Sequence, residues 1–147
     1  DGACVVHEEF KADGIRHARE QNPEAAVLVH PESPAAVIEE ADVVGSTTQI
    51  IEAAKSMPNP AFIVATDQGI FHYMQKEVPD KELIIAPTAG KGATCYSCAN
   101  CPWMAMNELE ALAQVFDRDD NEVFVDPELG RQAMIPLQRM LDFKKTM

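Results

Sequence analysis

The sequence is short of positive charge, and this shortage excludes two classes of partner. Its 147 residues include 12 Lys and Arg against 24 Asp and Glu, which gives a formal net charge of −12 at pH 7. A nucleic-acid groove or an anionic membrane surface requires a basic patch, so we expect neither nucleic acid nor membrane as a partner. No apolar run approaches the roughly 18 residues of a membrane span, and no charged-then-apolar leader opens the sequence.

The chain has only four cysteines, and their placement is unlike that of a secreted protein. Cys95, Cys98 and Cys101 lie close together, whereas Cys4 lies far upstream. A chain of this length builds a core without disulfides, so we expect a metal or redox site in the cytosol. The chain opens at Asp1 without a Met and runs directly into an apolar stretch, a start that we interpret as a cut inside a longer protein.

Apolar runs alternate with helical patterns along the chain. The runs lack polar alternation, which indicates strands buried on both faces; they lie at 26–29, 43–44, 62–65, 83–86 and 123–125. Helical patterns lie between them, at 8–21, at 34–41, from Ser46 onward and at 69–78. This alternation predicts an α/β fold, with a parallel sheet over residues 26–86 and helices on both faces.

The region after the predicted sheet has a different character. Residues 88–102 form a Gly- and Cys-rich loop, and apolar residues from Trp103 to Phe116 follow at helical spacing. Asp126 and Pro127 are expected to begin a last helical stretch, which Pro136 should kink or divide.

Polar residues follow three of the predicted strands, where ligands bind in open α/β sheets. His30 and Glu32 flank Pro31 and have the spacing of an acid/base pair. The same residues are also compatible with an ordinary loop, in which the Glu is solvated and the His forms hydrogen bonds with the backbone. Both interpretations stay open on spacing alone.

The other two polar strand ends are equally ambiguous. Ser46 and Thr47 can present hydroxyls and backbone N–H groups to an anion, and Ser46 with Gln49 also forms a capping box. For Thr66 and Asp67 we favour a turn with a helix cap.

The clustered cysteines admit several chemistries. Their spacing resembles the start of a bacterial iron–sulfur run without its fourth ligand. A zinc site from all four cysteines, a dithiol pair of Cys95 and Cys98, and buried thiols without a ligand are the alternatives. A non-enzymatic metal-binding or thiol redox module is therefore compatible with the sequence.

Longer blocks resemble one enzyme family. The block from Ala86 to Asn107, which contains Cys95-Tyr96-Ser97-Cys98-Ala99-Asn100-Cys101-Pro102-Trp103, resembles the C-terminal signature of quinolinate synthases. Segments 2–7, 29–34, 45–47 and 139–143 resemble the same family in the same order. The resemblance covers essentially the whole chain.

The resemblance implies both an activity and an architecture. Quinolinate synthases are cytoplasmic transferases of de novo NAD biosynthesis that condense iminoaspartate with dihydroxyacetone phosphate, and they are functionally linked to L-aspartate oxidase. They are more than twice as long as this chain, with three similar Rossmann-like α/β domains around a central [4Fe–4S] cluster. Residues 1–6 would end a preceding domain, 7–87 would form an α/β domain, and 88–147 would form the cysteine loop and C-terminal helices. With the N-terminal domains missing, we expect this chain to be inactive alone.

The resemblance also assigns roles to residues. Cys4 and Cys101 would be two of three cluster ligands, the third lying outside this chain, so that one iron stays open as a Lewis acid. Cys101 alone precedes Pro102 and a helix start, which favours its thiolate, so we do not expect Cys95 or Cys98 to be ligands.

The substrate site is assigned in the same way. His30, Pro31 and Glu32 would line the iminoaspartate pocket, with Glu32 as the catalytic acid/base and His30 as a further proton carrier. Ser46 and Thr47 would hold a substrate carboxylate. His7 would face the same cavity as a further catalytic residue.

Overall fold

The computed structural model describes residues 4–88, 99–118 and 120–145. The chain divides into two compact units, Asp1–Met106 and Asn107–Met147. The expected division at residues 6 and 87 follows the domains of the family and stays a prediction.

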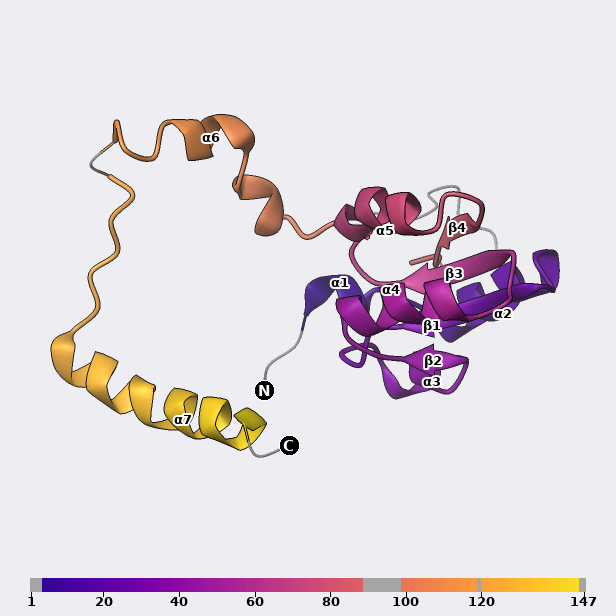
Figure 1. The fold of residues 1–147 in the computed structure, drawn as a ribbon, viewed down its shortest axis with the longest axis horizontal. Helices are drawn as coiled ribbons and strands as arrows, with labels where there is room; N and C mark the ends of the chain where they lie inside the picture. The colour runs from indigo at the N-terminus through magenta and orange to yellow at the C-terminus, as the bar shows by residue number, and fades with distance from the viewer. Residues whose placement is uncertain (1–3, 89–98, 119, 146–147) are drawn as a thin grey trace. The chain divides into compact units, whose positions relative to one another are not determined.

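The first unit is built on a four-stranded parallel sheet (Figure 1). The strands are β1 (Ala25–Val29), β2 (Val43–Val44), β3 (Ala61–Ala65) and β4 (Glu82–Ile85), in the order β2-β1-β3-β4. All three strand pairs are parallel. β1 and β3 are buried along their whole length, as their unbroken apolar runs predict. The predicted α/β fold is confirmed.

Helices cover both faces of the sheet. One face carries α1 (Val5–Glu8), α2 (Ala12–Gln21) and α3 (Ala35–Ile38), and the other carries α4 (Thr47–Ser56) and α5 (Phe71–Glu77), which follows a short 3-10 helix, η1 (Gln68–Ile70). Alternate strand residues point to opposite faces, so β1 and β3 each contribute to two separate core clusters. Ile15 of α2 packs in the cluster of Val27, whereas Met74 of α5 packs in that of Leu28.

The local helix signals are partly confirmed. The capping box at the start of α4 is present, because the Ser46 N–H donates to Gln49 Oε1 at 2.8 Å and the Gln49 N–H donates to Ser46 Oγ at 3.5 Å. The pattern over 8–21 forms two helices instead of one, with a break between Glu8 and Ala12. The pattern over 34–41 forms only the single turn of α3.

The predictions for the C-terminal region are less accurate. The helix expected from Trp103 to Phe116 is replaced by two short pieces, η2 (Met104–Met106) and α6 (Leu109–Ala113). Short helices depend on burial of an apolar face, and Trp103, Leu109 and Phe116 are exposed. The run 123–125 forms no strand, because its exposed side chains gain nothing from the burial that stabilises one.

The last helix, α7 (Pro127–Lys145), begins where the sequence predicts. Asp126 Oδ1 accepts hydrogen bonds from the Glu128 and Leu129 N–H groups at 3.0 Å each. The expected division at Pro136 is wrong, since α7 continues through this residue. Proline removes one backbone hydrogen bond, and the turns on either side keep theirs. Among the described helices, none combines the length and the apolarity that a membrane crossing requires.

The burial of α5 provides a test of this packing. Met74 is fully buried against the sheet, whereas Lys76 lies exposed on the same helix. We expect Met74→Ala to lower the free energy of unfolding by about 2–5 kcal/mol, because it leaves a cavity under α5. Lys76→Ala should change it by less than about 0.5 kcal/mol. Urea denaturation of the chain measures both, and equal effects would contradict the assigned packing.

Candidate functional site

The carboxyl ends of β1, β2 and β3 meet at one edge of the sheet. Val29 at the end of β1 pairs with Val44 of β2 and with Ala65 of β3. The ladder continues one residue further, because the His30 N–H donates to the Ala65 carbonyl at 3.1 Å and the Gly45 N–H donates to the Val29 carbonyl at 3.0 Å. His30 and the Ser46 segment therefore begin at the same edge, as predicted.

His7 is the buried centre of this edge. It lies in α1, and its neighbour Val6 packs in the core cluster. The His7 side chain is only 8 % exposed. Its Nδ1 lies 3.1 Å from Glu32 Oε2, in the loop after β1, and its Nε2 lies 3.1 Å from Thr66 Oγ1, directly after β3. The ring thus links the ends of the two central strands.

The surroundings of His7 favour its neutral form. Burial lowers the pKa of His7 below its ordinary value of 6.5, and the nearby His30 lowers it further, while the Glu32 carboxylate opposes both. A neutral imidazole has one donor nitrogen and one acceptor nitrogen. Because Glu32 offers only acceptors when ionised, we infer that Nδ1–H donates to Glu32 and that Nε2 accepts from the Thr66 hydroxyl.

The structure brings the His30 and Glu32 side chains to ion-pair distance, and their role as an acid/base pair stays a prediction. His30 Nδ1 lies 3.7 Å from Glu32 Oε2, close enough for an ion pair when the ring is protonated, and it accepts a hydrogen bond from the Glu32 backbone N–H at 3.4 Å. The His30 ring stacks on His7, with ring centroids 4.2 Å apart and planes at 8°. The Glu32 side chain is 58 % exposed, so one side of its carboxylate is open to a ligand. Pro31 lies exposed in the loop between them.

Ser46 and Thr47 lie at the N-terminus of α4. Ser46 is exposed and caps the helix, and Thr47 is half-buried in its first turn. Gly45 before them is buried, and a Cβ at this position would lie 2.7 Å from Gln49 Cβ, so the close approach of Gln49 leaves no room for a side chain here. The capping role is confirmed, and the anion-binding role stays a prediction.

Thr66 is a site residue that sequence reasoning assigned only to a turn. Its side chain is buried and contacts His7 Nε2. The feature that points to a site role for Thr66 is its position directly after β3, beside the ends of the neighbouring strands. Asp67 does cap, since its Oδ1 accepts from the Gly69 N–H at 2.7 Å, but its Oδ2 also accepts from the Cys101 N–H at 2.7 Å. Asp67 therefore ties Cys101 to the same sheet edge.

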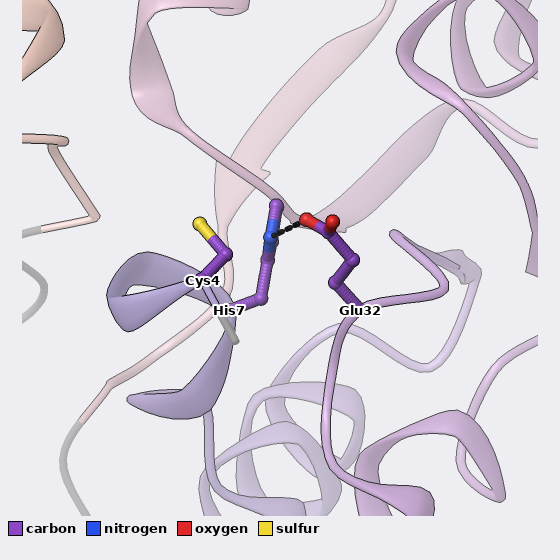
Figure 2. A group of neighbouring side chains, drawn as sticks. All are labelled: Cys4, His7 and Glu32. Carbon is purple, nitrogen blue, oxygen red and sulfur yellow. Dashed lines mark hydrogen bonds and ion pairs between the residues drawn. The ribbon is translucent and has the colours of Figure 1, made fainter. Parts of the chain in front are cut away.

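The described cysteines, Cys4 and Cys101, are free thiols, and both are partly buried against the same core cluster. The ligand atoms of Cys4, His7 and Glu32 all lie within 4.8 Å of one another. Figure 2 shows the His7 ring between the Cys4 thiol and the Glu32 carboxylate. Cys101 is not part of this group. The predictions for Cys95 and Cys98 lie outside the described residues.

A comparison with known families identifies one that matches nearly the whole chain. The family model described as quinolinate synthetase A protein matches residues 1–142 of the chain. The match includes the sheet, its polar edge, Cys101 and most of α7.

Proposed function

The chain belongs to the quinolinate synthetase A family, which acts in NAD biosynthesis, and we propose that it carries part of the active site that condenses iminoaspartate with dihydroxyacetone phosphate. The observation that carries the proposal is the convergence of Cys4, His7 and Glu32 at the carboxyl edge of the parallel sheet. Ligands of open α/β sheets bind at this edge.

Glu32 is the acid/base of the proposed reaction. Forming quinolinate from these substrates eliminates water and phosphate, and each elimination requires proton transfer. The Glu32 carboxylate is hydrogen-bonded on one side by His7 and open on the other, so it can exchange a proton with a bound substrate. His7 orients the carboxylate from a buried position. His30, stacked on His7 and 19 % exposed, offers a second proton carrier at the same place.

Anionic substrates need local hydrogen-bond donors in a chain of net charge −12. We assign a substrate carboxylate to the N-terminus of α4, where Thr47 and Ser46 lie beside the end of β2. The positive end of the helix dipole attracts an anion without a basic side chain. His30, Pro31 and Glu32 would then form the wall of the iminoaspartate pocket along the neighbouring strand end.

The described cysteines fit the iron–sulfur cluster of the family. Cys4 and Cys101 are free, partly buried thiols beside the same core cluster, and cysteine thiolates are the ligands that hold iron–sulfur clusters. The [4Fe–4S] cluster, when bound, supplies an iron without a protein ligand that acts as a Lewis acid. The Asp67 carboxylate, which holds the Cys101 N–H, fixes the second ligand relative to β3.

The proposal places the rest of the site outside this chain. The third cluster ligand and the remaining substrate contacts would come from the N-terminal domains of the family, so this chain alone would not form quinolinate. L-aspartate oxidase would supply iminoaspartate in the cytoplasm.

The role of Glu32 can be tested in the polypeptide that joins this segment to those N-terminal domains. Glu32→Gln keeps the shape of the side chain but removes its proton exchange, so we expect quinolinate formation to fall by about 10²–10⁴-fold. Bound iron should be unchanged. Glu39 is an exposed carboxylate a little further along the chain, so Glu39→Gln is the matched control and should keep full activity. Equal rates of quinolinate formation in the Glu32→Gln and Glu39→Gln enzymes would show that Glu32 takes no part in proton transfer.

The ligand assignment predicts a difference among the clustered cysteines. In the same polypeptide, reconstituted anaerobically, Cys101→Ser should lose most bound iron and sulfide, because it removes a cluster ligand. Cys95→Ser and Cys98→Ser should retain both. Iron and sulfide analysis measures the difference. Loss of the cluster in Cys95→Ser with retention in Cys101→Ser would reverse the assignment.

A further inference from the structure

Three side chains of the site belong to residue types that commonly bind zinc. Cys4, His7 and Glu32 offer one sulfur, one nitrogen and one oxygen, all within 4.8 Å of one another (Figure 2). Cys4 precedes α1 and His7 lies one turn further along it, so both side chains face the same direction. Glu32 approaches from the loop after β1. The group therefore combines two ligands that are close in the sequence, Cys4 and His7, with a third, Glu32, that is distant in the sequence.

We propose that the chain, when no cluster occupies Cys4, binds a single zinc-type divalent cation through Cys4 Sγ, His7 Nδ1 and Glu32 Oε2, with water as a fourth ligand. Zinc bonds of about 2.0–2.3 Å place two tetrahedral ligands roughly 3.5 Å apart. His7 Nδ1 and Glu32 Oε2 are already 3.1 Å apart. The exposed Glu32 side chain can adjust to complete the site.

The charges of the three ligands favour a divalent ion. The Cys4 thiolate and the Glu32 carboxylate together neutralise the two positive charges, and His7 contributes a neutral ring. A thiolate ligand selects zinc-type ions over magnesium and calcium, which prefer oxygen. Binding releases the Cys4 thiol proton to solvent, and the ring keeps one proton.

Thr66 provides the outer partner that a metal-bound histidine requires. A ligating imidazole donates its other N–H to an oxygen, which fixes the ring. Thr66 Oγ1 is buried at 3.1 Å from His7 Nε2 and is placed for this role. Metal binding therefore moves the ring proton from Nδ1 to Nε2, and the Thr66 hydroxyl changes from donor to acceptor.

The proposed ion and the iron–sulfur cluster would exclude each other, because both require the Cys4 thiolate. Zinc bound by the cluster-free chain would therefore delay cluster insertion. The inference depends only on the geometry of Cys4, His7 and Glu32, so it does not rest on the proposed reaction.

The test uses the cluster-free 147-residue chain with Cys95, Cys98 and Cys101 each changed to Ser, which leaves Cys4 as its only thiol. Anaerobic titration with Co²⁺ should give a thiolate-to-cobalt absorption band that saturates at one ion per chain and that Zn²⁺ displaces. Adding Cys4→Ser should abolish the band. Adding Glu32→Gln should weaken Co²⁺ binding at least about tenfold, and adding Glu39→Gln should not change it.

A second readout follows the His7 ring directly. Nitrogen-15 NMR of the same chain should show the His7 proton on Nδ1 before Zn²⁺ is added and on Nε2 afterwards. Because Glu32 is exposed, Glu32→Gln should keep the fold, which circular dichroism checks. Absence of the cobalt band, equal affinity in the Glu32→Gln and Glu39→Gln chains, or an unchanged His7 tautomer would overturn the proposal. None of these measurements involves quinolinate, so they are separate from the test of the reaction.

Discussion

The buried imidazole of His7 is the interaction on which the rest of the site depends. One ring nitrogen contacts Glu32 after β1 and the other contacts Thr66 after β3, so a single side chain joins the ends of two neighbouring strands. Removing the ring would leave the buried Thr66 hydroxyl without this contact and Glu32 without its positioning partner. An unsatisfied buried polar group costs about 1–3 kcal/mol, so the ring contributes to stability as well as to the site.

The parallel sheet makes this bridge possible. Since β1, β2 and β3 run in the same direction and in register, His30, Gly45 and Thr66 all emerge at one edge. The apolar strands are buried between two helical layers, while the polar residues lie at their ends. The same edge combines Glu32, a helix N-terminus and two cysteines, the groups that the proposed condensation would use. An acidic chain can bind such anions because the donors are local.

The sequence predicts the sheet well because burial on both faces leaves an unbroken apolar run, as in 62–65 of β3. It predicts the Ser46 cap because a capping box is a purely local interaction. It predicts the helix over 103–116 poorly, because helical spacing stabilises a helix only where the apolar face is packed, and Phe116 is 98 % exposed. The contact between Thr66 and His7 spans 59 residues, and no local pattern contains such a contact. The family resemblance placed His7 near the cavity, but only the structure gives its partners.

We propose that this chain supplies part of a quinolinate-forming site, and an assay of the chain with and without the N-terminal domains tests this role most directly. Iminoaspartate and dihydroxyacetone phosphate would be incubated anaerobically with the iron-reconstituted chain alone, and with the same chain joined to the N-terminal domains of the family. We expect no quinolinate from the chain alone and quinolinate from the joined polypeptide. Quinolinate from the isolated chain, or none from a joined polypeptide that carries its cluster, would contradict the proposed role.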